Sequence, residues 1–170
     1  MGKKSKEIAL AGMLTALAVV ILFLGSLVEL LDLSAAAMAA LVVMVALIEL
    51  GKGKAFAVYL ASSLLAVLLF PKTASVVFAA FIGYYPVLKV CLDKLRPKVL
   101  QYTAKLVLFN VFLALILWIT EGLLGLSSDW GSLGKALFLL GNMAFILYDF
   151  AIGRLAVFYI VKIKNRIRKR

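Results

Sequence analysis

The stretch SAAAMAALVVMVALIELGKGKAFAVYLASSLLAVLLF, residues 34–70, decides the fold, because two apolar runs of helical length flank a short break, Gly51 to Lys54. A membrane-crossing helix needs about 20 mainly apolar residues, so each run suffices for a short crossing. A re-entrant hairpin would instead place Lys52 and Lys54 in hydrocarbon, at about 2.5–3.5 kcal/mol each. We therefore predict two short membrane-spanning helices, 34–50 and 55–70.

The rest of the chain repeats this pattern of apolar runs and short polar breaks. Of the 170 residues, 65% are apolar and 16% are charged, a ratio that excludes a water-soluble enzyme. The first run is too long for the apolar region of a signal peptide, so we expect it to be retained. We predict an all-α, polytopic integral membrane protein whose residues 1–170 form one membrane domain with six transmembrane helices, at about 8–31, 34–50, 55–70, 74–92, 99–122 and 136–161.

The basic residues predict the orientation of the chain. It contains 19 Lys and Arg against 8 Asp and Glu, and most of the basic residues fall in the two termini, the Gly51–Lys54 break and the Asp93–Lys98 loop. Alternating crossings place these four segments on one side, which the positive-inside rule makes cytoplasmic. We therefore expect a multi-pass protein of the cell membrane, with both termini cytoplasmic and with basic clusters that contact anionic lipids. Because no aromatic platform accompanies the charges, nucleic acid is not an expected partner.

Motifs for catalysis and for metal binding are missing from the sequence. Histidine is absent, and Cys91 is the single cysteine, which excludes an intramolecular disulfide and a cysteine-rich metal site. No phosphate-binding glycine loop, HExxH motif or nucleophile elbow occurs. We therefore expect neither an enzyme, nor a cofactor, nor a bound metal.

Polar groups inside the last two predicted helices are candidates for a function, because each is costly in hydrocarbon unless it is paired or hydrated. Asn110 and Asp149 fall at similar depth, which predicts a hydrogen bond between them. Lys105 or Arg154 would then reach toward the Asp149 carboxylate. This network has two interpretations, helix packing or the handling of a ligand or ion.

A second group of candidates could form a substrate pocket that opens to the outside. In the fourth predicted helix, Gly83 and Pro86 flank two tyrosines, and a kink there could open a cavity. The alternatives are an ordinary interfacial rim and a kink with a purely structural role. The candidate substrate-binding residues are Glu29, Trp118, Thr120, Glu121, Trp130, Lys135, Asn142, Tyr84 and Tyr85.

Small residues on the first predicted helix permit the close approach of another helix. Gly12 and Ala16 form one pair at four-residue spacing, and Ala11 and Thr15 form a parallel pair. The partner could be a helix of this chain or a helix of another protein.

Together, the basic amino terminus running into Ile8–Ala18, the six predicted helices and the chain length resemble the substrate-binding S component of an energy-coupling factor (ECF) transporter. The resemblance implies that the protein binds a vitamin-like or other scarce small molecule from the outside, for uptake. It also implies that a transmembrane coupling subunit and two ATPase subunits, encoded elsewhere, supply the energy. Members of the family dock the coupling subunit through small residues on the first helix, and here Ala11 with Thr15, or Gly12 with Ala16, would occupy that position.

Two other classes of protein fit the same architecture. One is a non-transporting six-helix membrane scaffold of cell-envelope assembly, which needs helix faces for partners and no pocket. The other is an autonomous ion-coupled transporter, in which Asp149 would be the coupling carboxylate. The scaffold predicts that substitutions at Glu121 and Asn142 are silent, whereas both transporters predict that such substitutions abolish uptake.

Overall fold

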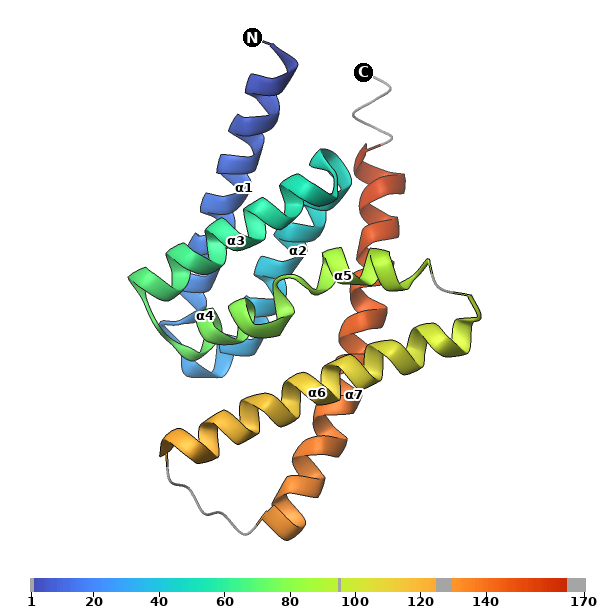
Figure 1. Ribbon diagram of the computed structural model, residues 1–170. Coiled ribbons are helices and arrows are strands. Elements are labelled where there is room, and N and C mark those ends of the chain that lie inside the picture. Colours follow the sequence, from blue (N-terminus) through green and yellow to red (C-terminus); the bar gives the residue numbers. More distant parts are fainter. Residues whose placement is uncertain (1, 95, 125–129, 165–170) are drawn as a thin grey trace. The chain divides into compact units, whose positions relative to one another are not determined.

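The computed structural model describes residues 2–94, 96–124 and 130–164, and these residues form helices joined by short connections, with no strand among them (Figure 1). Within these ranges the side chains of Lys3, Glu29, Lys98 and residues 115–124, 130–137 and 163–164 are not described. The α-helices are α1 (Lys3–Gly25), α2 (Asp32–Leu50), α3 (Lys52–Leu69), α4 (Thr73–Val77), α5 (Tyr85–Leu92), α6 (Lys98–Leu124) and α7 (Trp130–Phe158). A 3-10 turn covers Glu29–Leu31, and π-helical turns cover Phe78–Ile82 and Tyr159–Lys164.

Five helical segments are long and apolar enough to cross a membrane, which confirms the prediction of an all-helical protein with several such segments. They are Lys4–Gly25, Asp32–Leu50, Lys52–Leu69, Thr73–Leu92 and Phe138–Lys162. The described apolar part of α6, Val99–Ala114, is shorter. Large apolar side chains such as Ile8, Leu64 and Leu147 are more than 60% exposed, a surface that suits lipid better than water. The chain therefore has the composition and helix lengths of a multi-pass membrane protein.

The chain forms two compact units. Residues 1–90 and the segment from Arg154 onward make the first, and residues 91–153 make the second. The statement that residues 1–170 form one membrane domain stays a prediction.

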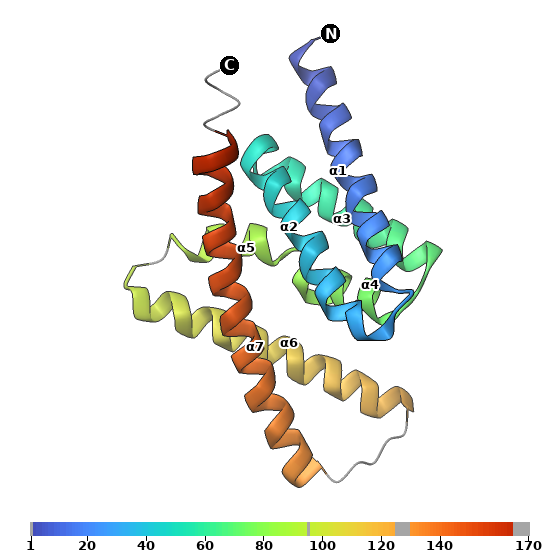
Figure 2. The ribbon, with the colours of Figure 1, turned by 180° about the vertical axis from the view of Figure 1, so that it is seen from behind.

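Small residues make the core of the first unit. Helices α1, α2 and α3 pack against one another in all three pairings (Figures 1 and 2). A methyl group on Gly25 would lie 2.0 Å from Cβ of Ala35, so only glycine permits this approach of α1 to α2. Alanines of α2 are also buried within the unit, and Ala36, Ala39, Ala40 and Ala46 are fully buried.

The first helix ends earlier than the predicted crossing, at Gly25 instead of about Leu31. The Ser26 hydroxyl donates to the carbonyl of Phe23 over 2.7 Å, and the Ser26 N–H closes the last turn on Leu22. The chain then turns, and α2 begins at Asp32. A run of apolar residues in the sequence does not reveal this turn, because the turn accompanies the close contact between Gly25 and Ala35.

The first unit has two distinct ends. An ion pair between Lys54 and Glu7 ties the start of α3 to the start of α1, and the Tyr159 hydroxyl donates to Oε1 of Glu49 over 3.4 Å. The amino terminus, the α2–α3 break and the carboxyl-terminal segment of this unit therefore share one end. The α1–α2 and α3–α4 connections lie at the opposite end (Figures 1 and 2).

The second unit is built on a contact between α6 and α7, which run in opposite directions. The rings of Phe109 and Phe145 stack with centroids 4.6 Å apart and planes 10° apart. One turn farther along, a methyl group on Gly141 would lie 3.4 Å from Cδ2 of Leu113, in ordinary van der Waals contact with the facing helix. These contacts recur at four-residue intervals along both helices, as expected for facing helical surfaces.

Candidate functional site

An open pocket of about 770 Å³ lies at the end of the first unit that contains the α1–α2 and α3–α4 connections. Its volume is within the range of small-molecule sites, about 300–1,000 Å³. Its wall comes from the 3-10 turn, the start of α2, the α3–α4 connection and α4. The lining residues are Leu30, Asp32, Leu33, Pro71, Lys72, Thr73 and Val77.

Two opposite charges line this pocket without pairing with each other. Oδ1 of Asp32 is buried and has no hydrogen-bond partner among the described residues. Lys72 is exposed on the opposite connection, and no ion pair joins it to Asp32. A buried carboxylate oxygen without a donor costs free energy, about 1–3 kcal/mol or more for a charged group. The pocket therefore offers a strong acceptor and a strong donor to a molecule that enters it.

Among the predicted substrate-binding residues whose side chains the structure describes, Tyr84, Tyr85 and Asn142, none lines this pocket. The side chains of Glu29, Trp118, Thr120, Glu121, Trp130 and Lys135 lie outside the described part of the chain, so their role stays a prediction. The sequence did carry a signal for the pocket, because Asp32 and Lys72 are charges in the two connections expected on the outer side. Their meeting across one cavity depends on how α2 and α4 pack, which the spacing along the chain does not reveal.

Tyr84 and Tyr85, the remaining tyrosine candidates, lie in an aromatic cluster inside the first unit. Tyr84 meets Tyr59 edge to face with centroids 5.7 Å apart, and Tyr85 packs on Phe81 at 5.6 Å. Tyr85 is only 1% exposed. Both tyrosines thus contribute to the core that holds α3 against the following segment, and the structure does not place them at the pocket.

A π-helical turn organises this cluster. The Gly83 N–H donates to the carbonyl of Phe78 over 2.9 Å, and the Tyr59 hydroxyl donates to the carbonyl of Ala79 over 2.6 Å. A methyl group on Gly83 would lie 2.8 Å from both the Phe78 carbonyl oxygen and the ring of Tyr59. A π-helical turn, Phe78–Ile82, therefore interrupts the fourth apolar segment just before Gly83. Pro86, which the sequence analysis identified, is a second irregular position in the same segment.

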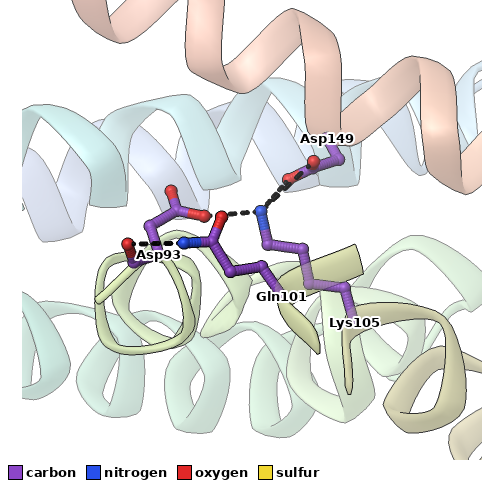
Figure 3. Close-up of polar contacts among 4 residues, drawn as sticks. All are labelled: Asp93, Gln101, Lys105 and Asp149. Atoms are coloured by element: carbon purple, nitrogen blue, oxygen red, sulfur yellow. Dashed lines mark hydrogen bonds and ion pairs between the residues drawn. The ribbon is translucent and has the colours of Figure 1, made fainter. Parts of the chain in front are cut away.

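Buried charges form a network in the second unit (Figure 3). Nζ of Lys105 on α6 lies 2.6 Å from Oδ1 of Asp93 and 3.4 Å from both carboxylate oxygens of Asp149 on α7. The Lys105 side chain is 5% exposed, that of Asp149 is 12% exposed and that of Asp93 is 43% exposed. The Gln101 amide donates to the backbone carbonyl of Asp93 over 3.0 Å, which ties the loop to α6. The Lys105 ammonium group thus lies beside two carboxylates, of which that of Asp149 is mostly buried and that of Asp93 is partly exposed.

The predicted hydrogen bond between Asn110 and Asp149 is wrong. Asn110 instead exchanges two hydrogen bonds with Asn142, of 2.9 and 3.0 Å, and each amide also donates to a carbonyl of its own helix. The prediction used only the distance of each residue from the end of its helix. It did not consider which pairing gives every hydrogen-bond donor and acceptor a partner. Two amides satisfy both donors and both acceptors, and Asp149 receives the ammonium group of Lys105.

The remaining candidates lie on the surface of the first unit. Arg154 is exposed. On α1, Gly12 and Ala16 are exposed, and a methyl group on Gly12 would meet no atom within 4 Å. Ala11 and Thr15 are half-buried, and the Thr15 hydroxyl donates to the Ala11 carbonyl over 2.9 Å. The α1 side chains buried in the unit are those of Leu14, Ala18 and Leu22.

No protein-family model, no curated protein and no solved structure matches this chain.

Proposed function

We propose that the chain is the membrane-embedded substrate-binding subunit of an importer that takes up a small molecule. The pocket lined by Asp32 and Lys72 carries this proposal, because a cavity of about 770 Å³ with unpaired opposite charges fits a small polar ligand. A scaffold for other membrane proteins has no need of such a cavity.

The sidedness of the charges supports uptake from outside. The pocket and the basic segments of the first unit, around Lys4, Lys52 and Lys162, occupy opposite ends. If the basic end is cytoplasmic, as the positive-inside rule predicts, the pocket faces outward. The proposal therefore includes both termini in the cytoplasm and a location in the cell membrane.

The source of energy in this proposal is separate ATPase subunits, coupled through a transmembrane partner, as in the ECF transporters that the sequence resembles. The exposed pair Gly12 and Ala16 on α1 supports a docking face for that partner, because small residues let helices approach closely in a membrane and no described residue of this chain covers the pair.

The ion-coupled alternative rests on Asp149, and the geometry supports it less well. A coupling carboxylate must exchange its proton or ion during transport. Lys105 already supplies Asp149 with a positive charge at 3.4 Å. A fixed ammonium group competes with an incoming cation, so the pair suits a packing role in the second unit.

Native mass spectrometry of the protein, gently extracted from cells that produce it, tests the proposal. We expect a bound small molecule together with one larger membrane subunit and ATPase subunits. Partners from cell-envelope assembly with no bound molecule would favour the scaffold. A bound molecule without ATPase subunits would favour the autonomous transporter.

A further inference from the structure

We infer that the pocket selects a dipolar small molecule, whose cationic group binds Asp32 and whose anionic group binds Lys72. This inference rests on the proposed function and names the class of its ligand. Four apolar residues of the lining, Leu30, Leu33, Pro71 and Val77, would contact the apolar part of the ligand. A small amino acid or a betaine has this combination of groups.

The state of the Asp32 carboxylate is the first argument. Its Oδ1 is buried without a hydrogen-bond donor, and the other residues of the pocket wall supply one flexible cation, Lys72, which does not pair with it. Asp32 as a residue is half-buried, and a carboxylate oxygen that is buried ordinarily has a donor or a cation as its partner. A ligand ammonium or quaternary ammonium group would supply the missing partner.

The position of Lys72 is the second argument. Lys72 and Thr73 line the same pocket from the α3–α4 connection, whereas Asp32 lines it from the start of α2. An ammonium group and a neighbouring hydroxyl are both suitable donors to a carboxylate. The two charges therefore come from separate elements, and a ligand with both charges would join those elements.

The composition of the wall is the third argument. Leu30, Leu33, Pro71 and Val77 share the wall with the charged pair, so the apolar part of a ligand would contact apolar side chains while its charged groups meet Asp32 and Lys72. A molecule with one charge would satisfy one side and leave the other carboxylate or ammonium group unpaired. Such an unpaired group is the usual reason for strong discrimination between similar ligands.

The test is to purify the wild-type protein and two isosteric variants, Asp32→Asn and Lys72→Gln, and to identify by mass spectrometry the small molecules that acid denaturation releases. We expect the wild type to release a molecule with both a cationic and an anionic group. Each variant should retain about tenfold less of it or lower, because each loses one charge-assisted interaction. Glu49→Gln and Lys52→Gln, which remove exposed charges at the other end of the unit, are the matched controls and should retain the wild-type amount.

A direct binding measurement completes the test with defined probes. Free α-amino acids and trimethylglycine should raise the unfolding temperature of the wild type. The corresponding amino-acid amides, which lack the anion, and N-acetyl amino acids, which lack the cation, should not. The unfolding temperature without ligand shows whether each variant is folded.

The outcomes separate the inference from the proposed function. A released molecule that lacks either charge, or retention of the wild-type amount by either pocket variant, would overturn the dipolar ligand and leave a small-molecule-binding subunit. A wild type that releases no molecule and responds to no probe would contradict both.

Discussion

In the second unit, the ammonium nitrogen of Lys105 lies 3.4 Å from the carboxylate of Asp149, although 44 residues separate the two along the chain. The pair is almost removed from solvent, so its two members depend on each other. This relationship makes an asymmetric prediction for the two single substitutions.

Lys105→Met should lower the free energy of unfolding by about 3 kcal/mol or more, because it removes the ammonium group that lies 3.4 Å from the buried Asp149 carboxylate. Asp149→Asn should cost less, because Lys105 keeps its contact with Asp93 at 2.6 Å. Unfolding of the purified protein in mixed micelles measures both values. Lys94→Met, an exposed lysine in the adjacent loop, is the control and should change stability by less than about 0.5 kcal/mol. Equal losses at Lys105 and Lys94 would contradict the network.

The reciprocal hydrogen bonds of Asn110 and Asn142 predict coupling between these two residues. Asn110→Leu and Asn142→Leu should each destabilise the protein, because each leaves the other amide without its partner. The double variant should lose less than the sum, by about 0.6 kcal/mol and at most about 1.7 kcal/mol, the average and the maximum measured for hydrogen bonds between membrane helices. A double-mutant cycle on unfolding free energies provides the value. Additive losses would show that the amides do not interact.

Two glycines in helical segments predict opposite effects of the same substitution. Gly83→Ala should destabilise the first unit by about 1–3 kcal/mol, since the new methyl group would lie 2.8 Å from a backbone oxygen of the π-helical turn. Gly12→Ala should be neutral or stabilising by up to about 1 kcal/mol, because it meets open space and alanine favours helix. Thermal unfolding of both variants provides the comparison, and a harmless Gly83→Ala would contradict the packing described for the tyrosine cluster.

If a coupling subunit docks at Gly12, a substitution there should reduce partner binding and uptake without affecting the binding of the small molecule. Gly12→Phe should reduce co-purification of the partner subunits and uptake, because a large ring on the exposed face of α1 prevents close helix contact. Binding of the small molecule should stay unchanged. Met13→Phe, at a residue that is 71% exposed and one position along the helix, is the control for a bulky ring in lipid. Loss of partners in both variants, or in neither, would contradict a docking face at Gly12.

The sequence predicts the helices well because their cause is local. Apolar runs such as 34–50, bounded by breaks such as Gly51–Lys54, need no tertiary information to become helices of membrane length. The sequence also offered Lys105 or Arg154 as a cation for the buried Asp149 carboxylate, and the structure brings Lys105 to it.

Three features were beyond the reach of the sequence, and each arises from packing between helices. The end of α1 at Gly25 depends on its contact with Ala35. The partner of Asn110 depends on the register of α6 against α7. The pocket depends on Asp32 and Lys72 lining one cavity, and the sequence places both charges in outer connections without showing that the packing of α2 and α4 brings them to the same cavity.

The central claim is an outward-facing pocket that binds a small molecule, and site-directed labelling in intact cells tests it most directly. In a Cys91→Ser background, Thr73→Cys places one thiol on the pocket wall, and Gly53→Cys places one at the other end of the first unit. We predict that a membrane-impermeant maleimide labels Thr73→Cys in intact cells and labels Gly53→Cys only after permeabilisation. We also predict that the molecule released from the wild type slows labelling at Thr73→Cys. Labelling of Thr73→Cys only after permeabilisation, or at a rate that this molecule does not change, would contradict the account.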